Sequence, residues 1–272
     1  MAKIPVCAMV FTLNEEINLP TCLASLTAFE QVIVVDSFSS DATKKIAIAA
    51  KAEFHQHEFT GFGDQRNWAL TELDLRCDWV LILDADERVP SELAKEISSI
   101  VNVEPAEAAF KIRRRFYLWG RWLKHSSLYP NWVVRLIHKD RVVYENRGHA
   151  ETQTLNGELG SLEHDLLDEN LKGIDDWYSR QLRYADQEAE YELSVETERL
   201  ALSDLFSADP LLRRLILKKI SWRMPCRAIV YFFYAYFFRL GFLDGVAGYR
   251  FCLMKASYQH MIAVKKAGKR LL

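Results

Sequence analysis

Asp84 and Asp86 are the residues of this sequence best suited to hold a metal ion. They follow residues 79–83 (WVLIL), an apolar run that predicts a buried strand, so both carboxylates leave the end of one strand. Mg²⁺ and Mn²⁺ prefer oxygen ligands and commonly take one or two carboxylates together with substrate phosphates. A cation would also remove the repulsion between the two side chains. We therefore predict a divalent metal here; the alternative is a solvated turn in which Asp86 caps the next helix.

Two further polar residues suit the binding of a nucleotide. Asp36 follows another apolar run, residues 31–35, and could accept hydrogen bonds from a base or a ribose. Arg66 comes after Gly61 and Gly63 at the start of a predicted helix, and a guanidinium matches the geometry of a diphosphate. Each also has a plainer interpretation, as a turn residue and as a surface arginine.

His149 and Glu151 could carry acid–base chemistry. Residues two positions apart on a strand point to the same side of it. Glu151 could then serve as a general base, while His149 orients it or contacts the acceptor. Two exposed polar side chains are the alternative.

The elements expected around these residues alternate between strands and helices. Strands are predicted at residues 6–11, 31–35, 53–57 and 79–83, and helices from residue 14, at 42–51, at 61–75 and from Pro90. Apolar strands that alternate with helices form a parallel sheet covered on both faces. Ligands bind beyond the carboxyl ends of such strands. Because Asn14, Asp36, Asp84 and Asp86 all fall just past strand ends, we expect one site at that edge of an α/β fold.

The pattern changes near residue 108. Longer, amphipathic strands are predicted at 109–117 and 133–138, and four aromatic residues lie between them: Trp119, Trp122, Tyr129 and Trp132. A helix is predicted at 174–193 from a stripe at helical spacing. Farther along, residues 228–238 (AIVYFFYAYFF) are apolar and strongly aromatic.

The C-terminal part differs from the rest in charge. Residues 211–272 contain 13 lysines and arginines and one acid, Asp244, so they carry +12, whereas residues 1–210 carry −14. The aromatic run is shorter than the ~20 residues that span a bilayer, and its tyrosines favour an interface. Four cations precede the run: Lys218, Lys219, Arg223 and Arg227. We predict a helix lying on an anionic membrane surface; a core helix with a basic rim is the alternative.

Other classes of protein fit the composition less well. The five cysteines are scattered and indicate neither a disulfide framework nor a zinc site. The N-terminus shows no apolar signal region, so we expect a cytoplasmic protein, peripheral on the inner face of a membrane. Nucleic acid is not an expected partner, because the aromatic residues of the tail are not interleaved with cations along a groove.

The sequence resembles the family-2 glycosyltransferases, in particular the bacterial branch of lipopolysaccharide-core β-glucosyltransferases. Four segments match in the family's order: VFTLNE at 10–15, VVDSFSSDAT at 34–43, GDQRNWA at 63–69 and LILDADE at 81–87. Two later segments, YPNWVVRL at 129–136 and GFLDG at 241–245 with Gly248, are similar more loosely.

The resemblance implies a GT-A-type fold and an inverting transfer of a hexose from a nucleotide-sugar, expected to be a uridine-diphosphate sugar, to a glycolipid or lipid-linked glycan. It implies Mg²⁺ or Mn²⁺ at Asp84 and Asp86, and a departing diphosphate stabilised by the metal and Arg66. The donor would be bound by Thr12, Asn14, Glu15, Asp36, Arg66 and Asp84. The acceptor side would include Trp119, Tyr129 and Arg135. We expect residues 1–107 to bind the nucleotide-sugar, 108–173 to form the acceptor half, and 174–272 to form a helical region.

The chain departs from the resemblance at one point, because Ala150 separates His149 from Glu151 where the branch has His and Glu adjacent. Glu151 remains the first candidate for the base, before Glu145 and Asp165. A polyprenyl-phosphate glycosyltransferase is an alternative function. A sugar nucleotidyltransferase fits less well, since residues 12–15 offer neither the glycine nor the cation of a triphosphate loop. A non-catalytic module would be expected to have lost Asp84 or Asp86.

Overall fold

A computed structural model, which describes residues 3–147, 150–196, 209–224 and 226–271, confirms the first four strands and their parallel arrangement. The strands are β1 (Ile4–Thr12), β2 (Phe29–Asp36), β3 (Glu53–Gln56) and β4 (Trp79–Asp84), in the order β3-β2-β1-β4. Helices α1 (Leu19–Ala24), α2 (Thr43–Ala49) and α3 (Phe62–Glu72) connect them. The helix expected from residue 14 begins only at Leu19, because residues 14–18 form the turn described below.

The sheet then changes direction. β8 (Asn131–His138) pairs antiparallel with both β4 and β6 (Ala109–Leu118), and β11 (Leu159–Asp168) runs parallel to β6. The short strand β5 (Glu87–Arg88) closes this edge, and β7 (Arg121–Trp122) pairs with the end of β6. The fold is therefore α/β with a mixed, mostly parallel central sheet of the GT-A kind. A separate hairpin is formed by β9 (Val142–Arg147) and β10 (Ala150–Leu155).

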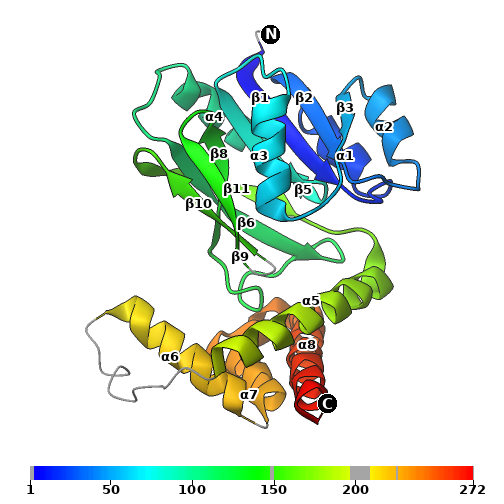
Figure 1. Cartoon of the computed structure of the whole chain (residues 1–272), viewed down its shortest axis with the longest axis vertical. Coiled ribbons are helices and arrows are strands. Elements are labelled where there is room, and N and C mark those ends of the chain that lie inside the picture. Colours follow the sequence, from blue (N-terminus) through cyan, green and yellow to red (C-terminus); the bar gives the residue numbers. More distant parts are fainter. Residues whose placement is uncertain (1–2, 148–149, 197–208, 225, 272) are drawn as a thin grey trace. The chain divides into compact units, whose positions relative to one another are not determined.

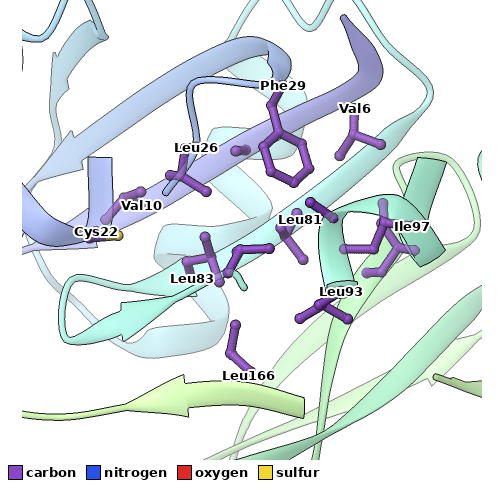
Figure 2. Close-up of a cluster of buried hydrophobic side chains, with 14 of the residues drawn as sticks. Val6, Val10, Cys22, Leu26, Phe29, Leu81, Leu83, Leu93, Ile97 and Leu166 are labelled. Atoms are coloured by element: carbon purple, nitrogen blue, oxygen red, sulfur yellow. The ribbon is translucent and has the colours of Figure 1, made fainter. Parts of the chain in front are cut away.

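Hydrophobic side chains cover both faces of the sheet, as the apolar strands predict. On one face, alternate residues of β1 and β4 pack with α1 and with α4 (Ser91–Val101), and Figure 2 shows Val10, Leu81 and Leu93 among this cluster. On the other face, the intervening residues pack against α3 and the β9–β10 hairpin. Figure 1 shows α3 crossing the sheet on that face. The two packed faces fix where β1, β2 and β4 end, and so where their polar C-terminal residues lie.

The chain divides into two compact units, Met1–Gly173 and Ile174–Leu272. The second is helical: α5 (Gly173–Glu196), α6 (Pro210–Arg223), α7 (Arg227–Phe233) and α8 (Gly245–Leu271) (Figure 1). A π-helical turn (Tyr234–Phe238) continues α7, and a 3₁₀ turn (Gly241–Asp244) precedes α8. Among the described residues no single helix has the length and apolarity of a membrane span. Arg227–Phe238 and Gly241–Leu271 together pass such a test by length and composition, but they are bent by 73°.

Candidate active site

Hydrogen bonds connect the turns that follow β1 and β2 at the carboxyl edge of the sheet. Thr12 Oγ1 donates to Asp36 Oδ1 (2.9 Å), and Ser39 N donates to Asp36 Oδ2 (2.8 Å). Asn14 has a positive φ of 55°, and its Oδ1 accepts from Ser40 N (2.9 Å). Asp36 is fully buried, so its carboxylate orders this edge. The structure thus brings Thr12, Asn14 and Asp36 together where ligands bind in such sheets.

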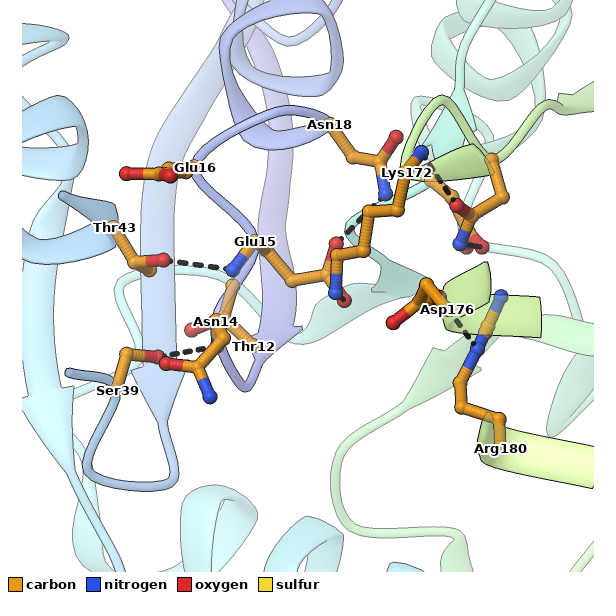
Figure 3. Close-up of polar contacts among 12 residues, drawn as sticks. Thr12, Asn14, Glu15, Glu16, Asn18, Ser39, Thr43, Lys172, Asp176 and Arg180 are labelled. Carbon is orange, nitrogen blue, oxygen red and sulfur yellow. Dashed lines mark hydrogen bonds and ion pairs between the residues drawn. The ribbon is translucent and has the colours of Figure 1, made fainter. Parts of the chain in front are cut away.

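Glu15 is held by the segment that follows β11 (Figure 3). Lys172 Nζ lies 2.5 Å from Glu15 Oε1, and Asn18 Nδ2 donates to Glu15 Oε2 (2.8 Å). Leu171 N donates in turn to Asn18 Oδ1 (2.8 Å). Burial raises the pKa of Glu15 in spite of the bonds to Lys172 and Asn18. Glu15 therefore joins the β1–α1 turn to the end of β11, whatever contact it makes with a donor.

Asp84 lies among arginines at the end of β4. Arg135 Nη2 bonds to Asp84 Oδ2 and also lies 2.7 Å from Glu87 Oε1, while Asp84 N donates to Glu87 Oε2 (3.0 Å). Burial raises the pKa of Asp84, but Arg135 and Arg66 outweigh it and bring the pKa to about 2. The side chain is still 39% exposed. Asp84 is therefore an ionised carboxylate with an accessible side, as a metal ligand must be.

Asp86, the second predicted ligand, is supported by residues at the end of β11. Asn170 Nδ2 donates to Asp86 Oδ2 (3.0 Å), and Glu169 N donates to the Asp86 carbonyl (3.0 Å). Burial and the nearby carboxylate of Asp86 raise the pKa of Asp168 to about 8, even though Arg114 lies 3.2 Å away. A neutral amide leaves the charge of Asp86 uncompensated, which suits the binding of a cation.

The donor set at this edge fits a divalent cation that shares its ligands with a substrate. Within the part of the chain that the structure describes, no three His, Cys, Asp or Glu side chains form a group able to hold a metal. Asp84 and Asp86 supply the two carboxylates that Mg²⁺ commonly takes, and phosphate oxygens and water complete such sites. The fit is to a metal that binds with a diphosphate, not to a closed structural site.

Arg66 enters this cluster from α3. Its guanidinium lies between the rings of Phe11 and Tyr144, 5.7 and 5.4 Å from their centroids, and its Nη2 is 3.8 Å from Asp84 Oδ1. Burial and the neighbouring Arg135 lower its pKa. Asn67 fixes the second ring: its Nδ2 donates to the carbonyl of Tyr144 (2.8 Å), and Tyr144 N donates to its Oδ1 (2.9 Å). The two rings thus hold a guanidinium beside Asp84, an arrangement that suits the binding of a diphosphate.

The three residues expected on the acceptor side lie in different surroundings. Trp119 is exposed and follows β6. Tyr129 Oη donates to Asp165 Oδ2 (2.9 Å). Arg135 is buried and contacts Asp84 and Glu87. The proline-to-Arg-Leu segment singled out in the sequence thus places an arginine at the end of β4.

A surface of cations and aromatic rings lies on β6, β7 and β8, and we call it the cation–aromatic surface. Lys111 and Arg113 lie over the ring of Trp132, 5.1 and 5.4 Å from its centroid. Arg115 and Lys124 lie over Trp122, at 4.7 and 5.7 Å. The odd-numbered residues of β6 share one side of the strand, which brings Lys111, Arg113 and Arg115 together. This surface offers flat rings and positive charge to a ligand.

Glu151, Glu145 and Asp165 are the candidates for the general base, and the structure describes the side-chain contacts of the last two. His149 lies outside the described residues, as does the side chain of Glu151, although Glu151 belongs to β10. Glu145 pairs with Thr152 across the hairpin, and its Oε1 accepts from Thr154 Oγ1 (3.2 Å). Asp165 accepts from Arg113 Nε (2.7 Å), Arg115 Nε (2.6 Å) and Tyr129. Burial raises the pKa of Asp165, but these donors outweigh it and lower the pKa, so Asp165 is poorly suited to take a proton.

Several residues of the cluster were not singled out by the sequence: Glu87, Arg114, Asp168, Asn170 and Lys172. Two signs were available. Arg114 alternates with the apolar Phe110 and Ile112 on the core side of β6, and a cation in that position needs a buried partner. Residues 168–170 (DEN) follow a strand, as Asp36 and Asp84 do. Because β11 lies far along the chain, only the fold reveals that the residues after it contact Asp86 in the turn after β4.

The sequence of the chain is similar to those of known glycosyltransferases. Over 148 residues the chain is 26% identical to a lipopolysaccharide core biosynthesis glycosyltransferase of Rhizobium meliloti, a match that covers 53% of the chain and 54% of that relative, so it spans about half of that relative's length. It is 27% identical over 250 residues to an uncharacterized glycosyltransferase of Rickettsia conorii, covering 89% and 82% of the two chains.

A solved structure shares the fold. The mannosyltransferase PcManGT of Pyrobaculum calidifontis, in complex with GDP-Man and Mn²⁺, superposes with a TM-score of 0.52 at 15% identity, over 98% of this chain and 88% of that one. The family model for glycosyl transferase family 2 matches residues 7–156, which run from within β1 to just past the end of β10. The chain belongs to glycosyl transferase family 2.

Proposed function

We propose that this glycosyltransferase moves a hexose from a nucleoside-diphosphate sugar, with a uridine-diphosphate sugar as the expected donor, to an acceptor hydroxyl with inversion at the anomeric carbon. The observation that carries the proposal is the position of Asp84: an ionised, partly exposed carboxylate at a strand end, next to Asp86 and 3.8 Å from Arg66. Carboxylates and a guanidinium at the carboxyl edge of a sheet suit a metal-bound diphosphate.

Each group of the cluster has a task in this reaction. Asp84 and Asp86 would hold Mg²⁺ or Mn²⁺, and a bound cation would neutralise charge on the leaving diphosphate. Arg66 donates to the phosphate oxygens from a position fixed by Phe11 and Tyr144. Arg135 keeps Asp84 ionised and oriented. These residues thus stabilise the departing group, which gains negative charge as the glycosidic bond breaks.

The acceptor side must remove a proton. We propose that Glu151 accepts it from the acceptor hydroxyl while that oxygen forms the new bond to the anomeric carbon and the nucleoside diphosphate leaves with the bonding electrons. The support is its place on the β9–β10 hairpin, which Asn67 ties to α3 and so to Arg66. Inversion follows, because one displacement occurs on the face opposite the leaving group.

We propose a glycolipid or lipid-linked glycan as the acceptor. One relative is named for lipopolysaccharide core biosynthesis, which supports this class of substrate. The cation–aromatic surface supports it independently, because tryptophan rings suit the apolar faces of sugars and the cations suit phosphate or carboxylate groups on a glycan. Trp132 is 39% exposed, so its ring is open to such a ligand.

Donor hydrolysis tests the proposal without knowledge of the acceptor. The chain would be incubated with UDP-, GDP-, ADP- and CDP-sugars, with Mn²⁺ or Mg²⁺, and release of the nucleoside diphosphate would be followed. We expect one class of donor to be hydrolysed, and Asp86→Ala and excess chelator to stop the reaction. Undiminished hydrolysis by Asp86→Ala would contradict the proposed site, and hydrolysis of no nucleotide-sugar would contradict the proposed donor class.

A further inference from the structure

The second unit presents an apolar stripe on α7 and its π-helical end. Three pairs of residues at a spacing of four are exposed: Ile229 and Val230, Phe233 and Tyr234, and Phe237 and Phe238. Five of them (Ile229, Val230, Phe233, Tyr234 and Phe238) line an open hollow of about 410 Å³ whose surface is almost entirely apolar. The opposite side of the same helix packs inward, where Ala235 is buried and Tyr236 lies 5.6 Å from the ring of Tyr249 on α8. The exposed stripe is therefore not the side that builds the helical unit.

The stripe continues around a sharp turn of the chain. Leu240 adopts a left-handed φ of 61°, and a Cβ on Gly241 would lie 2.7 Å from the carbonyl of Ala235. A Cβ on Gly248 would lie 2.4 Å from the carbonyl of Gly241. The glycines of the tail motif therefore allow the two helical segments to meet in a tight bend. The bend carries strongly exposed apolar side chains, with Phe238 at 82% and Val246 at 68%.

The charges near the bend differ from what the sequence suggested. Arg227 is buried, and its Nη1 lies 2.8 Å from Glu192, so it is a structural cation and is not available to lipid. Lys265 and Lys269 pair with acids of α5. The unit 174–272 contains 16 basic and 11 acidic residues, so its charge is +5, less than half of the +12 of residues 211–272. Apolar burial must then supply most of any membrane affinity, and charge the smaller part.

One property of the bend distinguishes a lipid surface from a protein partner. Asp244 is the sole acid of residues 211–272, and it is buried. The bend therefore offers rings and aliphatic side chains without an exposed carboxylate, which an anionic headgroup would repel. Tyr234 and Tyr249 lie on the flanks, and tyrosine favours the interface between hydrocarbon and water.

We propose that the bend formed by Phe233–Phe238 and Leu240–Val246 inserts into one leaflet of an anionic bilayer and holds the enzyme at the membrane surface. An amphipathic segment of this kind buries its apolar side ~5–10 Å into the boundary between headgroups and acyl chains. This proposal does not depend on the donor, the metal or the base, because none of those residues lies in the unit 174–272.

Flotation with vesicles tests the proposal on the full chain. Vesicles of phosphatidylcholine with phosphatidylglycerol, and of phosphatidylcholine alone, would be mixed with the protein at low salt and at 1 M NaCl. We expect the intact chain to float with the mixed vesicles, and binding to weaken in high salt without disappearing, because screening acts on charge and not on apolar burial. The double variant Phe233→Ser/Phe238→Ser should lose at least about tenfold in partitioning, since each buried phenyl ring contributes roughly 1.5–3 kcal/mol, where 1.4 kcal/mol is tenfold.

A matched control removes two exposed apolar residues from the first unit, Ile48→Ser/Val103→Ser, and should float like the intact chain. Far-UV circular dichroism and thermal melting of all three proteins show whether they stay folded, independently of any activity. The proposal is overturned if the intact chain does not float with mixed vesicles, or if the double variant floats equally well. Sedimentation without lipid tests whether a second copy of the chain covers this surface instead. If the intact chain is a dimer, the double variant is a monomer and neither floats with vesicles, the surface is an interface between two copies.

Discussion

Arg135 Nη2 lies 2.7 Å from Glu87 Oε1, and both side chains are almost completely buried beneath Asp84. The same nitrogen bonds to Asp84, so one guanidinium compensates the buried carboxylate of Glu87 and the carboxylate that we propose as a metal ligand. Arg135 is therefore the cation closest to both carboxylates, and Arg66 and Arg114 add to its effect from 3.8 and 3.4 Å.

Replacement of Arg135 by methionine should destabilise the protein by about 3 kcal/mol, because it removes the nearest cation from both Asp84 and Glu87, while Arg66 and Arg114 stay farther away, at 3.8 and 3.4 Å. Urea denaturation followed by tryptophan fluorescence measures this loss. The matched control is Arg76→Met, which removes an exposed arginine paired with Glu53 and should cost less than about 1 kcal/mol. Equal losses in the two variants would contradict a special role for Arg135.

Asp86→Asn should abolish sugar transfer and donor hydrolysis while leaving the melting temperature within a few degrees of its original value. The carboxylate is partly exposed and accepts from the Asn170 amide, so its loss removes a metal ligand without emptying the core. Titration with Mn²⁺ in the presence of the nucleoside diphosphate should show binding to the intact chain only. Asp140→Asn, at an exposed position, is the control.

Glu151→Gln should lower the turnover number by roughly 10²-fold or more, in line with the usual contribution of a general base, and leave donor affinity nearly unchanged. Glu145→Gln, on the paired strand of the same hairpin, is the comparison. If Glu145→Gln shows the large loss and Glu151→Gln does not, the base lies one strand away. Steady-state rates at saturating donor separate the two outcomes.

Asp165 should stabilise the fold near neutral pH and lose that effect in acid. Its pKa is lowered in the folded protein by Arg115, Tyr129 and Arg113, so it favours folding above its unfolded pKa of about 3.9. The contribution is lost as the pH falls through the lower, folded value. Asp165→Asn should thus be less stable than the original chain at pH 6, by about 3 kcal/mol, and the gap should close toward pH 2. Urea midpoints at several pH values measure the gap; a gap that does not change with pH would contradict this account.

Trp132→Ala should raise the KM for the acceptor by roughly tenfold, because aromatic contacts contribute about 0.5–1.5 kcal/mol and the cations stacked on the ring would lose their position. Donor hydrolysis should be unaffected, and Trp132→Phe should restore most of the affinity. An unchanged acceptor KM in Trp132→Ala would remove the cation–aromatic surface from the acceptor site.

The nucleotide-binding half could be predicted closely from the sequence because its information is local. Strands such as 79–83 are apolar without interruption, and the polar residues that follow them mark the strand ends directly. The predicted strands at 109–117 and 133–138 are also present, but their antiparallel course is not encoded in any single segment. The parallel arrangement expected for the first four strands is present, and the antiparallel strand β8 makes the whole sheet mixed.

The details of the cluster could not be predicted because they depend on contacts distant in sequence. Asn170 meets Asp86 across 84 positions, and Lys172 meets Glu15 across 157. The resemblance implied that Arg135 lies on the acceptor side, yet its guanidinium contacts Asp84 and Glu87. Arg135 lies at the register shift between β6 and β8, which no single segment of the sequence reveals. Arg227 was expected at the membrane surface because it flanks an apolar run. In the structure it is buried and pairs with Glu192 on α5.

The double hydrogen bond between Asn67 and the backbone of Tyr144 has a mechanical consequence. The side-chain amide of Asn67 bonds to both the N–H and the carbonyl of Tyr144, as a residue of a neighbouring strand would. Arg66 directly precedes Asn67 on α3. If a donor diphosphate binds Arg66 as proposed, a displacement of that side chain would reach the β9–β10 hairpin, which carries Glu145 and Glu151, through these two hydrogen bonds. The proposed function would then favour an order of binding in which the donor comes first.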